Sequence, residues 1–174
     1  MIVHFYRLDG APADVPPLDD QLQLSWWSPE RDGLPGRGSR RLVNYWWWVL
    51  SRLGGFSRPG FAELRIERGG RVLHRLIVTP RWYRFPFMAA GDLQIGDVWT
   101  ADEMRRRGLA RIGIAEAHRR FAGGGEAMWY VTDASNKASA AAALASGFRH
   151  VAVGRRTRPL GSALLGRYVI DRFI

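Results

Sequence analysis

Residues 91–111 constrain the fold of this chain more than any other segment. Their first half alternates between two faces, which predicts a strand whose one face carries Leu93, Ile95, Asp97 and Trp99. Their second half is a basic loop, residues 105–110, and a helix expected to open just after Gly108. The first amides of a helix have no intrahelical acceptor, and the helix dipole favours an anion beside them. Because Gly108 has no Cβ, the segment predicts a turn that a phosphate can approach closely.

The loop also matches a known pattern at three positions. Arg105, Gly108 and Ala110 stand where the GNAT acyltransferases, which transfer an acyl group from coenzyme A, have Arg or Gln, then Gly, then Gly or Ala. The loop therefore resembles the one whose amides hold the CoA pyrophosphate in that family. Three matched positions by themselves would also fit an ordinary basic turn between a strand and a helix.

A second segment strengthens the resemblance. Asn136 opens the sequence NKASAAAALASGF, which closes on Gly147 and Phe148. The next helix of GNAT proteins is similar: it begins near such an Asn and ends on Gly-Phe about a dozen residues later. The resemblance covers residues 59–174 and implies one domain over residues 1–174. It also implies a mixed α/β fold, with a twisted sheet of about seven strands, helices on both faces, and strands that splay apart at the acyl-CoA site.

The order of expected elements agrees with that fold. A two-residue turn at Gly69 and Gly70 predicts a hairpin, and Ser39 is a candidate cap for a helix that Gly54 and Gly55 would end. Residues 18–25 fit neither a helix nor a strand clearly. The expected strands cover residues 2–8, 60–68, 71–80, 92–99, 128–132, 148–154 and 167–173, and the expected helices cover residues 40–53, 109–121 and 137–146.

The resemblance implies a set of cofactor contacts. The pantetheine arm of acetyl-CoA is expected to pair with the backbone of the splayed strand, as an added strand would. The phosphates are expected on the loop, and the start of the following helix is expected beside them. The implied contact residues are Val98, Trp99, Arg105, Arg106, Arg107, Gly108, Leu109, Ala110, Arg111, Asn136 and Ser139.

Acyl transfer to an amine requires a group that takes the amine proton. Some GNAT proteins have a carboxylate at the position that is Gln94 here. Asp92, on the same expected face, is the first candidate base, and the alternative is that it caps the end of the strand. His74 is the second candidate, because its unperturbed pKa suits proton transfer at neutral pH; a structural histidine is the alternative.

The proton donor for the leaving thiolate is less clearly marked. GNAT proteins often have a tyrosine four residues before the Gly of Gly-Phe, and Ala143 stands there in this chain. Three interpretations follow. The thiolate leaves unaided, Tyr130 or Tyr168 substitutes from a strand, or the protein binds acyl-CoA without turnover.

Composition narrows the setting. The chain has 26 basic and 16 acidic residues, a net charge of +10, which suits an anionic ligand. It contains no cysteine, which excludes disulfides and fits a reducing, cytoplasmic location. We expect no signal peptide, no membrane span and no metal site, since the four histidines lack ligand spacing. Nucleic acid is a minor alternative, suggested only by the aromatic and basic residues 81–87.

Three adjacent tryptophans, Trp46, Trp47 and Trp48, cannot all face one core, because neighbouring residues of a helix point in different directions. They predict an acceptor site, a homodimer surface or a membrane contact, or else a wedge between the helix and its neighbouring loops.

We therefore predict an N-acetyltransferase that uses acetyl-CoA and a small primary amine. The aromatic segment RWYRFPFM, residues 81–88, looks similar to GNAT proteins of surface-polysaccharide synthesis, which implies an amino-sugar acceptor. The alternatives are a polyamine or aminoglycoside, a protein amine, and a regulatory module that binds acyl-CoA with little or no catalysis.

Overall fold

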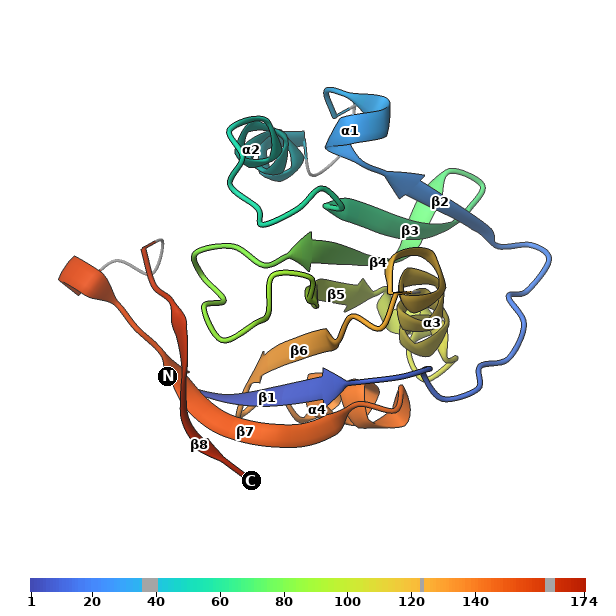
Figure 1. Cartoon of the computed structure of the whole chain (residues 1–174). Helices are drawn as coiled ribbons and strands as arrows, with labels where there is room; N and C mark the ends of the chain where they lie inside the picture. Colours follow the sequence, from blue (N-terminus) through green and yellow to red (C-terminus); the bar gives the residue numbers. More distant parts are fainter. Residues whose placement is uncertain (36–40, 123, 162–164) are drawn as a thin grey trace.

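A computed structural model describes residues 1–35, 41–122, 124–161 and 165–174. Eight strands form one sheet in the order β2-β3-β4-β5-β6-β1-β7-β8 (Figure 1). The strands are β1 (Ile2–Leu8), β2 (Gln23–Trp27), β3 (Ala62–Arg68), β4 (Arg71–Pro80), β5 (Leu93–Thr100), β6 (Met128–Asp133), β7 (Arg149–Arg156) and β8 (Tyr168–Phe173). The helices are α1 (Pro29–Asp32), α2 (Arg41–Arg52), α3 (Leu109–Phe121) and α4 (Lys137–Ala145), with 3-10 turns at Asp102–Met104 and Pro159–Gly161.

The predicted hairpin is confirmed. Gly69 and Gly70 have φ angles of 55° and 77°, which glycine adopts without strain, and they join β3 to β4. The expected helix after residue 39 is present as α2, but its proposed cap, Ser39, lies outside the described residues together with Arg40.

The strand β2 is the main addition to the elements expected from sequence. It pairs antiparallel with β3, so that Leu24 lies opposite Ile66 and Trp26 lies opposite Leu64. Residues 18–25 were ambiguous because this edge strand is short and only half-buried. Its polar and apolar residues therefore do not alternate over enough positions to predict a strand. The sheet consequently has eight strands where about seven were expected.

The pairing of β5 with β6 is parallel and short. It includes three residue pairs and ends where Ile95 lies opposite Tyr130, although β5 runs on to Thr100 and β6 to Asp133. The β4–β5 register shifts beside this point, and Asp97 has a φ angle of 49°. This bulge turns the second half of β5 away from β6. The predicted splay of the sheet is therefore present.

The bulge also breaks the alternation expected along β5. Strict alternation would place Val98 and Trp99 on opposite faces. Both instead pack against the same hydrophobic core, because the extra residue at Asp97 shifts the side-chain pattern by one position.

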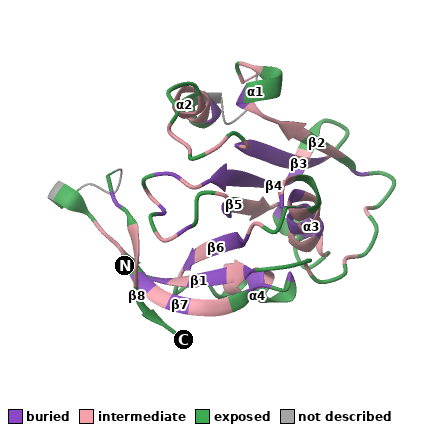
Figure 2. Cartoon of the chain, in the orientation of Figure 1, coloured by how far each residue is buried: buried purple, intermediate pink, exposed green. Residues whose placement is uncertain are grey.

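Two cores cover the two faces of the sheet. The larger core lies under α3 and α4 and includes Leu109, Ile114 and Ala143. The other lies under α2 and the β4–β5 loop, where Trp47 packs against a cluster containing Phe5, Trp82 and Trp129. Figure 2 shows that buried residues concentrate on the central strands and that α1 and the end of β8 are exposed. In the described ranges, no helix has the length and apolar character needed to cross a membrane.

Gly113 allows α3 to lie close to β4. A Cβ atom at this position would stand 2.8 Å from His74 Nε2 and 3.0 Å from Leu76 Cδ2. Gly to Ala is usually stabilising inside a helix, but here we expect Gly113→Ala to lower the free energy of unfolding by about 1–3 kcal/mol through overpacking.

Urea unfolding measures this difference, with Gly10→Ala as the control, because a Cβ atom at Gly10 meets nothing within 4 Å. A Gly113→Ala protein as stable as the wild type would show that α3 does not lie as close to β4 as the structure places it.

Candidate functional site

The basic loop joins β5 to α3 through two unusual backbone conformations. Arg106 has a φ angle of 61° and Gly108 a φ angle of 80° with ψ near 0°, so the chain reverses tightly before α3 begins. The first intrahelical bond runs from Ile112 N to Gly108 O, at 3.0 Å. The amides of residues 109–111 therefore have no acceptor within the helix and lie at its positive end. The turn thus leaves backbone amides open to a ligand, and the binding of an anion there stays a prediction.

The arginines of this loop differ in what they contact. All three are exposed, and Arg105 forms an ion pair with Asp102 at 2.7 Å. Arg111 donates to the backbone carbonyl of Asp14. Exposed guanidinium groups beside free amides add bidentate donors for a phosphate.

The segment before β2 lies against this loop, a contact that no sequence pattern predicts. Besides the contact of Asp14 with Arg111, the Cγ atom of Pro16 would be 3.7 Å from a Cβ atom at Gly108. The prolines of this segment predict a loop. They do not predict which distant turn that loop packs against.

The start of α4 lies close to α3 and carries the predicted cap. Asn136 Oδ1 accepts a hydrogen bond from Ser139 N at 3.0 Å, which confirms that Asn136 opens this helix. The side chain of Ser139 lies close enough to the Tyr130 hydroxyl to lower its pKa. Tyr130 is 4% exposed and is the last residue of β6 that pairs with β5, so this hydroxyl pair lies where the two strands part.

Val98 and Trp99 lie beyond that point, on the part of β5 that has no partner on the β6 side among the described pairs. The guanidinium of Arg75 lies 4.7 Å from the centre of the Trp99 ring. The backbone of this part of β5 has the edge that an extended ligand arm can pair with.

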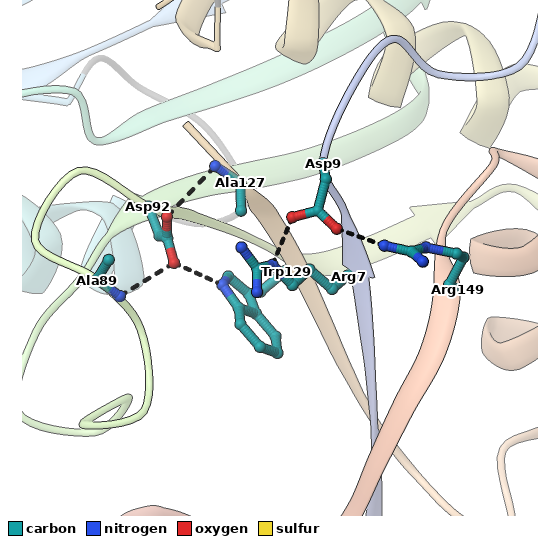
Figure 3. Close-up of polar contacts among 7 residues, drawn as sticks. All are labelled: Arg7, Asp9, Ala89, Asp92, Ala127, Trp129 and Arg149. Atoms are coloured by element: carbon teal, nitrogen blue, oxygen red, sulfur yellow. Dashed lines mark hydrogen bonds and ion pairs between the residues drawn. The ribbon is translucent and has the colours of Figure 1, made fainter. Parts of the chain in front are cut away.

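Asp92 lies just before β5 and holds three donors (Figure 3). Its carboxylate accepts from Trp129 Nε1 at 2.8 Å, from Ala89 N at 3.0 Å and from Ala127 N at 3.3 Å. These contacts tie the β4–β5 loop to the start of β6. The structure thus gives Asp92 the contacts of the strand-end cap that was the alternative to a catalytic base.

A second group of charges holds the neighbouring strands (Figure 3). Arg7 lies over the Trp129 ring at 5.3 Å and forms an ion pair with Asp9 at 2.7 Å. Arg149 pairs with the same carboxylate, also at 2.7 Å. Trp129 is therefore fixed by Asp92 at its indole N–H and by Arg7 on its face.

His74 is fully buried between β4 and α3. Its Nδ1 lies 2.8 Å from Thr100 Oγ1, and its Nε2 has no hydrogen-bond partner in the described part of the chain. Loss of solvation and, to a smaller extent, the positive charge of Arg75 lower its pKa to about 4, although a hydrogen bond with the Trp99 backbone opposes the shift. His74 is consequently neutral at physiological pH, and α3 covers it.

The remaining candidates lie at different depths. Ala143 is fully buried on the inner side of α4. Tyr168 stacks on Phe85 at 5.3 Å at the start of β8, which is three strands from β6 in the sheet. Burial raises the pKa of Tyr130, while its bond to Ser139 lowers it. Of the two strand tyrosines considered from the sequence, Tyr130 is the one at the splay.

Gln94 faces the α2 side of the sheet at the splay. Its Oε1 accepts from Thr79 Oγ1 at 2.8 Å, and its Nε2 donates to the Ile95 carbonyl at 2.5 Å. The amide thereby bonds to the backbone of β5 at the last residue that pairs with β6.

The three tryptophans of α2 have separate environments. Trp47 packs on Phe61 at 5.1 Å and on Trp82 at 5.2 Å. Trp48 stacks on Tyr45 at 5.6 Å, and Trp46 is 58% exposed. Packing accounts for Trp47, whereas a homodimer or membrane contact through Trp46 stays a prediction.

No family model and no curated protein matches this sequence. The solved structures that are similar to the chain include three whose matches each cover 87% of it. They are a Drosophila protein (22% identity, TM-score 0.57), a putative GNAT acetyltransferase from Novosphingobium aromaticivorans (20%, 0.52) and a GCN5-related N-acetyltransferase from Sphaerobacter thermophilus (16%, 0.53). The chain spans 48%, 61% and 49% of their lengths, respectively. These likenesses show the fold, which is that of the GNAT acetyltransferases.

The burial of His74 predicts how stability depends on pH. In the unfolded chain His74 titrates near 6.5, and in the folded protein near 4. The unfolded state therefore binds more protons between these values, and stability falls as the pH drops through this window. We expect the titration of His74 to lower the free energy of unfolding by roughly 3 kcal/mol over this pH window.

The measurement is urea unfolding at several pH values for the wild type and for His74→Gln, which cannot titrate there. The difference in unfolding free energy between the two proteins should shrink as the pH falls from 6.5 to 4. A difference that does not change with pH would contradict a buried, neutral His74.

Proposed function

We propose that this chain, which has the GNAT fold, transfers an acetyl group from acetyl-CoA to a primary amine. One observation carries the proposal: the loop before α3 presents unpaired amides and exposed arginines, and it follows the end of β5 that diverges from β6. A pyrophosphate on the loop would leave the pantetheine arm free to extend along the exposed edge of β5. The donor would thus arrive at the splay from the end at which β5 leads into α3.

The residues present suit this co-substrate. The amides of Leu109, Ala110 and Arg111 are available to an anion, and the exposed Arg106 and Arg107 add charge. An ideal Cβ atom at Gly108 would meet nothing closer than 3.7 Å, so the turn is open on that side. We place the arm against Val98 and Trp99, with Asn136 and Ser139 across the splay, and Arg105 shaping the loop through Asp102.

In the proposed reaction the neutral amine attacks the thioester carbonyl. A C–N bond forms, the C–S bond breaks, the nitrogen loses a proton and the departing thiolate gains one. We assign the donation of the second proton to Tyr130. It lies at the splay, and the Ser139 side chain lies close to its hydroxyl. Ser139 and Asn136 are in turn held at the start of α4.

The first proton has two candidate acceptors from the sequence. Asp92 already accepts three hydrogen bonds, and His74 is covered by α3. We therefore propose that water takes the amine proton. In this scheme Asp92 acts by holding Trp129, and His74 acts through Thr100 at the end of β5.

For the acceptor we propose an amino sugar, in the cytoplasm. Residues 81–88 fold over the α2 face of the sheet, where Trp82 and Phe85 are buried and Tyr83 is 42% exposed. Exposed aromatic rings suit the apolar faces of sugars, and arginines suit their phosphates. One observation favours a second function: Ala143 stands at the usual tyrosine position, so an acyl-CoA-binding module without catalysis is the alternative.

Binding of acetyl-CoA tests the first step. We expect it to raise the melting temperature of the wild type by mass action on the folded state. Gly108→Asp should abolish the shift, because it puts a side chain and a negative charge where the pyrophosphate would lie. The matched control is Gly125→Asp, since Gly125 also has a positive φ angle, of 91°, and open space around it.

Release of free CoA with a panel of amines then separates an enzyme from a binding module. A wild-type protein that shows no thermal shift with millimolar acetyl-CoA would rule out both functions. If Gly125→Asp loses the thermal shift to the same extent as Gly108→Asp, the loop before α3 is not the acetyl-CoA site.

The proposed proton donor gives a further prediction. Tyr130→Phe keeps the ring against Phe148, 6.0 Å away, and removes only the hydroxyl. We expect kcat to fall about a hundredfold, the lower range of general acid catalysis, and the melting temperature to change little. Tyr168→Phe should leave kcat within about twofold, since its ring packs at the start of β8. Equal rates for Tyr130→Phe and the wild type would show that the thiolate leaves unaided.

A further inference from the structure

A pocket of about 440 Å³ opens on the α2 side of the sheet. It is formed by the loop after α2, the start of the β4–β5 loop and the residue before β8. We propose that this pocket binds a phosphate group of the acceptor, so that the acceptor is a phosphorylated amino sugar and not a polycation. This inference rests on the acetyltransferase function proposed above.

The charge of the pocket comes from two arginines that are far apart in sequence. Arg81 follows β4 and Arg167 precedes β8, and both line the pocket. No Asp or Glu is among the lining residues, and neither guanidinium forms an ion pair with a carboxylate in the described ranges. Two guanidinium groups with no counter-charge favour a phosphate and repel a polyamine.

The rest of the lining suits a sugar. Phe56, Trp82 and Tyr83 supply aromatic surface, and Gly54 and Gly55 leave room beside it. The volume lies in the range of sites that enclose small ligands, whose walls are largely aromatic or apolar with a few polar groups that fix orientation. The two arginines take the orienting role here.

The backbone around the pocket is held in place without a ligand. Ser57 N donates to the Arg81 carbonyl at 2.8 Å, and Ser57 Oγ donates to the Ala90 carbonyl at 2.7 Å. Arg167 N donates to Thr157 Oγ1 at 2.8 Å. Both arginines thus extend from fixed backbone, and less ordering entropy opposes binding.

The position of the pocket fits a second substrate. Arg81 comes directly after Pro80, which pairs with Leu93 at the start of β5. The splay begins three residues along β5, about 10 Å away at the rise of a strand. The CoA loop follows the opposite end of β5, and Figure 1 shows the β4–β5 loop and the start of β8 on one side of the molecule and α3 on the other. A phosphate held here would let the amine of its sugar point toward the splay.

Binding measured by calorimetry with saturating CoA tests the proposal, because CoA then occupies its own loop. The probes are glucosamine 1-phosphate, uridine diphosphate, glucosamine and spermidine. We expect the two phosphates to bind and the two amines without phosphate to bind at least about tenfold more weakly. Tighter binding of uridine diphosphate would identify a nucleotide-linked sugar, and tighter binding of glucosamine 1-phosphate a simple sugar phosphate; either supports the inference.

The variant Arg81→Gln/Arg167→Gln should weaken phosphate binding about tenfold or more, and the exposed Arg172→Gln should change it less than about twofold. Thermal unfolding with acetyl-CoA checks that each variant folds and keeps its CoA loop. Phosphate binding that CoA abolishes, that survives in the double variant, or that is no stronger than binding of glucosamine would overturn the inference. If acetyl-CoA still binds in any of these cases, the proposed acetyltransferase function stands and only the phosphate pocket is ruled out.

Discussion

The parallel pairing between β5 and β6 is the constraint on which the site depends. Three residue pairs join these strands, and the pairing ends at Ile95 and Tyr130. The bulge at Asp97 then directs the rest of β5 away from β6. Longer pairing would occupy the backbone of Val98 and Trp99 and leave no edge for a ligand. The same divergence opens the sheet beside the hydroxyl pair of Tyr130 and Ser139, and it aims the end of β5 at the turn that starts α3.

Charge is arranged around that opening from both ends of β5. The loop before α3 contributes Arg106 and Arg107, and the pocket beyond β4 contributes Arg81 and Arg167. These four arginines, at opposite ends of one strand, account for part of the net charge of +10. In the proposed reaction between two anionic substrates, each cationic group would offset the repulsion that keeps the two apart.

Buried polar residues near the site fix the backbone. Asp92 joins the β4–β5 loop to β6 through three donors, and His74 joins β4 to Thr100 under α3. Each group was a candidate base because its residue type and strand position suit proton transfer. The sequence does not show how many donors surround a carboxylate or which helix covers an imidazole. An anchoring role and a catalytic role therefore could not be told apart before the fold was known.

Local patterns in the sequence determined a large part of this protein: the hairpin turn at Gly69 and Gly70, the loop and helix around Gly108, the cap at Asn136 and the GNAT order of elements. These features depend on neighbouring residues, whose periodicity and backbone preferences are readable directly. Tertiary structure alone decided the edge strand β2, the contact of Asp14 with Arg111, the burial of His74 and the meeting of Arg81 with Arg167. Each of these joins segments distant in the chain, and the free energy that selects them comes from packing and pairing across the sheet, which no local pattern records.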